Sequence, residues 1–154
     1  MERRFHEFLA RVRDLAYEQL GAEGGAFQSR IRFSYLQLYR QDPRIHYEVW
    51  PQRKTARIEI GLHFEGEREA NYAWAGALSQ RMAEIQAQLG PSAELEEWTR
   101  SWTRLHETLP LPPGALTEEL AMEVARRLVQ LMRVMEPMLA SAEPGTSSGV
   151  GRRP

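Results

Sequence analysis

The sequence contains no cysteine and no long uninterrupted apolar run, and these two absences exclude several classes of protein. Without cysteine there are no disulfides, no thiol nucleophile and no thiolate metal ligands. No apolar stretch approaches the ~18 residues that indicate a membrane-spanning helix, so we expect no membrane partner. The N-terminal stretch MERRFHEFLARVRDL mixes acidic residues into its apolar positions, which argues against export and favours, by default, a cytoplasmic location.

Lysine, asparagine and aspartate are scarce. Lys54 is the only lysine, Asn71 the only asparagine, and Asp14 and Asp42 the only aspartates, whereas arginine and glutamate are abundant. Scarce Asn and Cys suit a thermophile, and a GC-rich genome explains the arginines equally well. The formal net charge of −1 provides no global basic field, so we expect no nucleic-acid partner.

The length of 154 residues, with 42% hydrophobic and 27% charged residues, is typical of one globular domain. We expect this domain to cover residues 1–140. The remainder, 141–154, reads SAEPGTSSGVGRRP and has almost nothing to bury, so it is predicted to be a disordered tail.

Amphipathic periodicity predicts three helices, over residues 2–20, over residues 68–89, and from Thr117 to about Glu136. The glycines after Leu20 should end the first helix. Thr117 is a good N-cap for the third helix, and Pro137 should end or kink it.

Strand signals are clearest over residues 44–65, where Ile58, Ile60, Leu62 and Phe64 alternate with polar residues. This stretch is predicted to be a hairpin with Pro51 to Lys54 as its loop. Three further strands are predicted, near 30–40, 93–98 and 101–107, although the spacing in 30–40 also fits a helix. The predicted fold is α+β, with about five antiparallel strands, three helices and the order α-β-β-β-α-β-β-α.

The exposed side of the hairpin collects histidines and glutamates. If Trp50 pairs with Thr55, then Glu48 lies opposite Arg57 and His46 lies opposite Glu59. Opposite charges across a strand pair contribute about 0.2–1 kcal/mol each, so the pattern is explained by a charge ladder without any function. The set of candidate site residues on this face is His46, Glu48, Arg57, Glu59, His63 and Glu65.

The same face also suggests a metal or acid–base site. Imidazole binds transition metals and carboxylates can complete a coordination shell, so the candidate ligands are His46, Glu59, His63 and Glu65. Their spacing matches no tight helical motif. A restriction-type nuclease would need paired acids and a nearby lysine, but Lys54 lies in the predicted loop and Asp42 is the nearest aspartate.

A short repeat, Trp-Thr-Arg, occurs at residues 98–100 and 102–104. Trp98, Trp102 and Arg104 are therefore candidate binding residues, because arginine beside tryptophan can stack on bases or ligands. The alternative is that both tryptophans close the end of the core, with Arg104 pairing with Glu96 or a neighbouring glutamate.

The order of elements over residues 2–140 resembles that of type III secretion chaperones and related small bacterial domains. The resemblance implies a homodimer that binds extended segments of partner proteins without catalysis. Met122, Met132, Met135 and Met138 of the third helix are consistent with core or dimer packing. We therefore expect a non-enzymatic protein- or peptide-binding domain with no cofactor. The alternative is a small metal-dependent enzyme, for example one that hydrolyses phosphodiesters, with its site on the hairpin.

Overall fold

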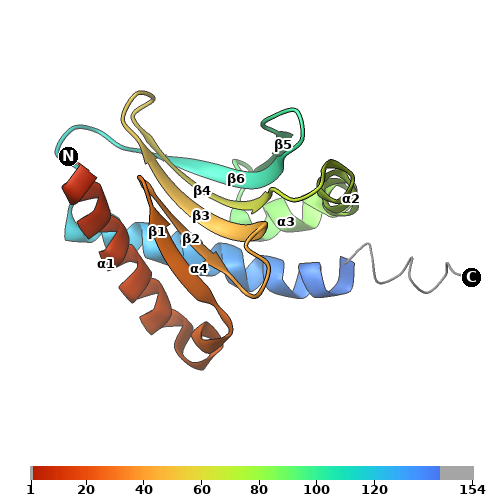
Figure 1. The fold of residues 1–154 in the computed structure, drawn as a ribbon, viewed down its shortest axis with the longest axis horizontal. Coiled ribbons are helices and arrows are strands. Elements are labelled where there is room, and N and C mark those ends of the chain that lie inside the picture. The colour runs from red at the N-terminus through yellow and green to blue at the C-terminus, as the bar shows by residue number, and fades with distance from the viewer. Residues whose placement is uncertain (1, 143–154) are drawn as a thin grey trace, which may run out of the picture.

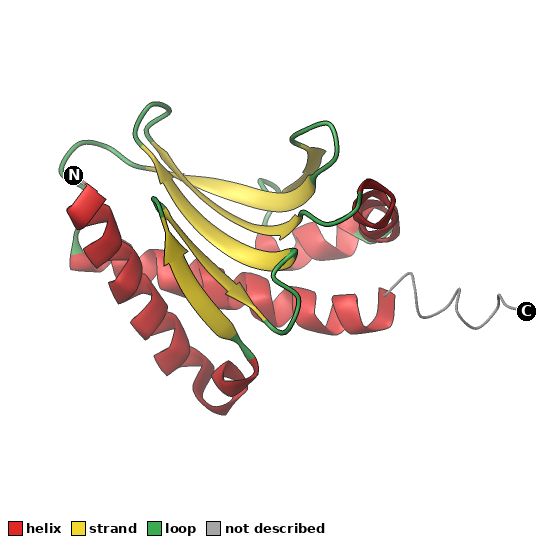
Figure 2. Cartoon of the chain, in the orientation of Figure 1, coloured by secondary structure: helices red, strands yellow, loops and turns green. Residues whose placement is uncertain are grey.

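The computed structural model describes residues 2–142 as an α+β fold, with a six-stranded antiparallel sheet and four α-helices (Figures 1 and 2). The strand order is β1-β2-β3-β4-β6-β5. The predicted class is confirmed, whereas the predicted five strands and three helices are each one too few. The elements are α1 (Glu2–Leu20), the 3-10 helix η1 (Gly21–Ala26), β1 (Gln28–Arg32), β2 (Tyr35–Tyr39), β3 (Ile45–Gln52), β4 (Arg57–Phe64), α2 (Arg68–Ser79), α3 (Met82–Leu89), β5 (Glu94–Glu97), β6 (Thr103–Pro110) and α4 (Glu118–Ala142).

One face of the sheet packs on α1 and α4, and α4 runs behind the strands along the molecule (Figure 1). The alternating residues of β4 that face these helices have no exposed surface, and burying each contributes roughly 1.5–3 kcal/mol. Because side chains alternate across a strand, the polar residues between them point to the opposite face. The apolar residues of β4 are Ile58, Ile60, Leu62 and Phe64.

Residues 30–40 form a hairpin, not the single strand that was predicted. The turn is at Phe33 and Ser34, between β1 and β2. Phe33 has a φ of 52°, a left-handed conformation that is uncommon for a bulky side chain, and its ring is largely exposed. No glycine, proline or asparagine marks this turn, which explains why the sequence pattern did not reveal it.

Two of the predicted helices also differ in extent. The predicted helix over 68–89 is broken at Gln80 and Arg81, which separate α2 from α3. In α4, Thr117 caps the helix by accepting a hydrogen bond from the Leu120 N–H to its Oγ1 (3.2 Å), as predicted.

Pro137 was predicted to end or kink the third helix near Glu136. It does not end α4, since the helix continues through Pro137 to Ala142. A proline removes one helical hydrogen bond, and burial of Met138 beyond it holds the last turns against the core. Two residues of the predicted tail, Ser141 and Ala142, therefore belong to α4. The rest of that predicted tail lies outside the described residues.

The central hairpin forms as predicted but in a different register. The turn covers residues 53–56, so Gln52 pairs with Arg57 where Trp50 was expected to pair with Thr55. Pro51 remains inside β3 because the pairing of β3 with β2 already ends at Val49. The predicted pairs of Glu48 with Arg57 and of His46 with Glu59 are consequently wrong.

The methionines of α4 do not form a surface seam. Met132, Met135 and Met138 are buried in the domain's own core, and only Met122 is exposed. The cluster is therefore explained by core packing, and it provides no support for the predicted dimer.

Candidate functional site

The sheet face opposite α1 and α4, called the polar face below, carries ionisable side chains that are almost completely buried. His63 has 0% of its surface exposed, Glu59 1%, His46 2% and Glu48 5%. Charged groups are seldom buried to this extent unless they are paired or bind a metal. The polar face is formed by Gln37 of β2, His46 and Glu48 of β3, Glu59, Gly61 and His63 of β4, Arg104 and His106 of β6, and Glu94 and Glu96 of β5.

Gly61 creates the space at the centre of this face. A Cβ at Gly61 would lie 2.8 Å from the Cβ of His106 and 3.3 Å from Oε2 of Glu59. Because Gly61 has no side chain, the carboxylate of Glu59 leans over it and reaches His63 on the far side. Oε2 of Glu59 lies 3.1 Å from His63 Nε2 and 2.8 Å from Nη1 of Arg104.

These contacts shift the pKa values of both groups. Burial alone would raise the pKa of Glu59, but its contacts with His106 and His63 and the charge of Arg104 outweigh burial and lower it to about 2. Burial alone would lower the pKa of His63, but its hydrogen bonds to Glu59 and Glu65 raise it to about 10. In the metal-free protein the pair is therefore a carboxylate and an imidazolium at neutral pH.

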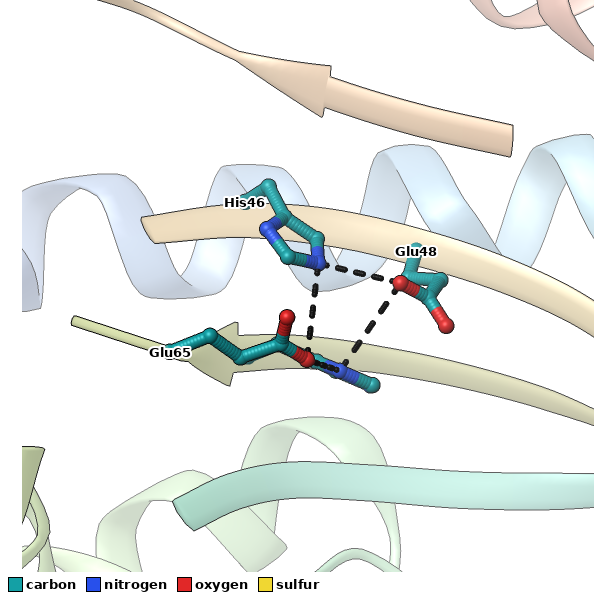
Figure 3. Close-up of side chains that lie close together, drawn as sticks. His46, Glu48 and Glu65 are labelled. Carbon is teal, nitrogen blue, oxygen red and sulfur yellow. Dashed lines mark hydrogen bonds and ion pairs between the residues drawn. The ribbon is translucent and has the colours of Figure 1, made fainter. Parts of the chain in front are cut away.

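His63 of this pair also belongs to a group of four side chains that point toward one another (Figure 3). They come from β3, β4 and the residue that follows β4. We call His46, Glu48, His63 and Glu65 the four-residue cluster. Nε2 of His46 lies 3.0 Å from Oε1 of Glu48, and Nδ1 of His63 lies 2.9 Å from Oε2 of Glu65. Across the cluster, His46 Nε2 to Glu65 Oε2 and His63 Nδ1 to Glu48 Oε1 are each 3.9 Å.

Each histidine of the cluster is oriented through its other ring nitrogen. His46 Nδ1 lies 2.8 Å from the carbonyl oxygen of Pro43, which can only accept a hydrogen bond, so Nδ1 carries the proton. His63 Nε2 faces Glu59 in the same manner. Gln37 donates its amide N–H to Oε1 of Glu48 (3.2 Å). Such outer contacts to a carbonyl or carboxylate orient metal-binding histidines in proteins.

The structure changes the roles that the sequence assigned. Glu59, predicted as a ligand, lies behind His63 as its hydrogen-bond partner, and Glu48 takes its place in the cluster. Arg57 is exposed near the hairpin turn, away from the cluster. Gln37 and His106 were not predicted, because the strand alignment that places them here cannot be derived from local patterns.

Trp98 covers the centre of the polar face. Its ring lies 5.5 Å from that of His63 and 6.3 Å from that of Trp50, and the guanidinium of Arg104 is 4.7 Å from its centroid. Trp102 contacts Trp98, at 5.7 Å between rings. Neither tryptophan belongs to the apolar core, so the prediction that they close its end is wrong, whereas the predicted ion pair of Arg104 with Glu96 is present.

A separate groove of about 1050 Å³ is lined by the β2–β3 turn, η1 and the C-terminal half of α4. Aromatic side chains such as Phe27, Tyr47 and Trp74 line it. Its charged residues are paired, as shown by the 2.6 Å contact of Arg40 with Glu136. The groove therefore offers a mainly apolar surface, and the charges of Arg40 and Glu136 neutralise each other at its wall.

No protein-family model, curated protein or solved structure matches the chain. Among residues 2–142, no helix combines the length and apolar character needed to cross a membrane. The geometry of the polar face is therefore the basis for assigning a function.

Proposed function

We propose that this protein binds one divalent transition-metal ion through the four-residue cluster of His46, Glu48, His63 and Glu65. The observation that carries the proposal is the convergence of two imidazole nitrogens and two carboxylate oxygens, all within 4.8 Å of one another. Imidazole and carboxylate together suit zinc and its neighbours in the first transition series.

The distances within the cluster support a tetrahedral ion. With metal–ligand bonds of about 2.0–2.1 Å, neighbouring ligand atoms of a tetrahedral site are separated by about 3.3 Å. Four of the six distances between ligand atoms are 2.9, 3.0, 3.9 and 3.9 Å, which bracket that value, and the other two lie within 4.8 Å. Binding would require small movements of the side chains toward a common centre.

The charge of the cluster also supports a divalent cation. His46 uses its Nδ1 proton on Pro43, so its Nε2 lies beside Oε1 of Glu48 (3.0 Å) and the amide nitrogen of Gln37 (3.2 Å). His63 faces Glu65 through Nδ1 and Glu59 through Nε2, and these hydrogen bonds raise its pKa to about 10. A divalent ion would displace the proton on His63 Nδ1, and the two carboxylates of the cluster would balance its charge.

A complete set of four protein ligands favours a structural metal site over a catalytic one. Catalytic zinc sites keep a position for water, whereas structural sites are closed by four protein ligands. For the predicted alternative, a metal-dependent phosphodiesterase, the cluster thus supports the metal site but not the hydrolytic activity. We propose a metal-dependent structural or sensing role for the cluster.

The expected protein- or peptide-binding role, the homodimer, the cytoplasmic location and the resemblance to type III secretion chaperones remain predictions. The aromatic groove beside Tyr47 and Trp74 is the surface on which peptide binding would be tested. The metal proposal is independent of all four.

Calorimetric titration of chelator-treated protein with zinc tests the proposal. We expect the wild-type chain to bind zinc and the His63→Gln and Glu65→Gln variants to lose affinity by more than the roughly 10–100-fold that loss of an outer contact costs. His6→Gln is the matched control, because His6 lies on α1 outside the polar face. Circular dichroism would establish that each variant is folded. Folded wild-type protein that binds no zinc, or variants that bind as it does, would refute the proposal.

A further inference from the structure

We infer that the edge of the sheet holds a second divalent-metal site, formed by Glu94 and Glu96 of β5 and His106 of β6. We call these three residues the edge cluster. Their ligand atoms also lie within 4.8 Å of one another, and none of them belongs to the four-residue cluster. This site goes beyond the proposed function, since it would bind a second ion.

Strand pairing brings the edge cluster together. β5 is the last strand of the sheet, and its pairing with β6 places Glu94 directly opposite His106 and Glu96 opposite Arg104. Side chains two residues apart on one strand share a face, so both glutamates reach the same imidazole. Nε2 of His106 lies 2.9 Å from Oε1 of Glu96 and 3.7 Å from Oε1 of Glu94.

The ring of His106 is the observation that points to a ligand. Only 7% of the residue is exposed, and neither ring nitrogen has a partner aligned for a hydrogen bond, despite the short distances to the carboxylates. A buried polar nitrogen left in this state costs free energy. A metal ion between the imidazole and the two glutamates would satisfy Nε2 and both carboxylates together.

Glu59 also lies next to the second ring nitrogen of this histidine. Oε2 of Glu59 lies 3.3 Å from His106 Nδ1 and 3.1 Å from His63 Nε2, so one carboxylate lies behind a histidine of each cluster. A carboxylate behind the second ring nitrogen is the common arrangement for a metal-binding histidine.

The edge cluster differs from the four-residue cluster in two ways. It offers three protein ligands, and Glu94 is largely exposed, so water completes the coordination and the ion is accessible to solvent. In addition, Arg104 donates to Oε1 of Glu96 at 2.6 Å, and this cation competes with a metal. We therefore expect the edge cluster to bind its ion more weakly than the four-residue cluster.

Cobalt(II) titration of the full chain, followed by equilibrium dialysis and visible absorption, tests this inference. The wild-type protein is expected to bind two cobalt ions. The Glu96→Gln variant and the Glu94→Gln variant should each lose the weaker ion and keep the tighter, tetrahedral one. Glu97→Gln is the matched control, because Glu97 is on the same strand but outside the cluster, and it should keep both ions.

The variants also separate failure of this inference from failure of the proposed function. A single bound ion that is retained in Glu96→Gln but lost in His63→Gln would overturn the edge site alone. A single ion lost in Glu96→Gln but retained in His63→Gln would support the edge site and overturn the four-residue site. Loss of both ions in Glu97→Gln would overturn the assignment of ligands at the edge, and absence of any bound cobalt would overturn both sites.

Discussion

Replacing Glu59 by glutamine would remove the charge at the centre of the polar face with little change in shape. In the wild-type protein, Oε2 of Glu59 faces His63, Arg104 and His106 within 3.3 Å, and only 1% of the residue is exposed. Removing one partner of a buried ion pair typically costs about 3–5 kcal/mol, because the other charge stays buried without compensation. The glutamine carbonyl can still accept a hydrogen bond from Arg104, so we expect a loss near 3 kcal/mol.

Urea unfolding of the metal-free protein, in the presence of a chelator, measures this loss. With a urea m-value of about 2 kcal/mol per molar, 3 kcal/mol corresponds to a midpoint lower by about 1.5 M. Glu118→Gln is the control, because its partner Arg11 and Glu118 itself are each about half exposed, and its midpoint should not change. A loss below about 1 kcal/mol for Glu59→Gln would refute the view that this carboxylate compensates buried positive charge.

Two further predictions concern the same centre. Gly61→Ala would force a Cβ to within 2.8 Å of the Cβ of His106, so we expect the free energy of unfolding in urea to fall by about 1–3 kcal/mol. Gly76→Ala on α2 is the control, because a Cβ there meets nothing within 4 Å, and it should stabilise the protein by roughly 0.5–1 kcal/mol. Equal effects of the two alanines would contradict the close packing over Gly61. In metal-free protein, the pKa of His63 is raised to about 10, so its contribution to stability is complete below pH 6.5 and is lost as pH rises through 10. The pKa of Glu59 is lowered to about 2, so its contribution is complete above pH 4.5 and is lost as pH falls through 2. Urea midpoints should therefore receive their largest contribution from this pair between pH 4.5 and 6.5, and Glu59→Gln should flatten that dependence.

Local patterns were sufficient to predict the central hairpin and the polarity of its two faces. The alternation of Ile58 to Phe64 with polar residues identified one buried side, and the structure confirms it. The helix of residues 2–20 was also predicted with the right bounds, because the glycines after Leu20 mark its end.

The partners of each polar residue could not be predicted. Moving the turn from residues 51–54 to 53–56 changes every cross-strand pair, so that His46 faces His63 and Glu48 faces Gly61. Moreover, Glu59 reaches His63 along its own strand only because Gly61 leaves the space between them empty. That contact depends on a missing side chain, and no residue pattern indicates it.

The role of β5 and β6 also depended on tertiary pairing. The sequence pattern identified both strands but not that β6 lies between β4 and β5, which brings His106 and Arg104 onto the polar face. β4 and β6 lie far apart in the sequence, and pairing of distant strands is set by the whole sheet and not by local propensity.

X-ray absorption at the zinc edge most directly tests the four-residue cluster as a metal centre. The Glu96→Gln variant, loaded with one equivalent of zinc, confines the ion to that cluster. The account predicts four nitrogen and oxygen ligands at about 2.0–2.1 Å, with the outer-shell scattering of two imidazoles. A six-coordinate spectrum without imidazole scattering, from protein that is folded and has zinc bound, would contradict it.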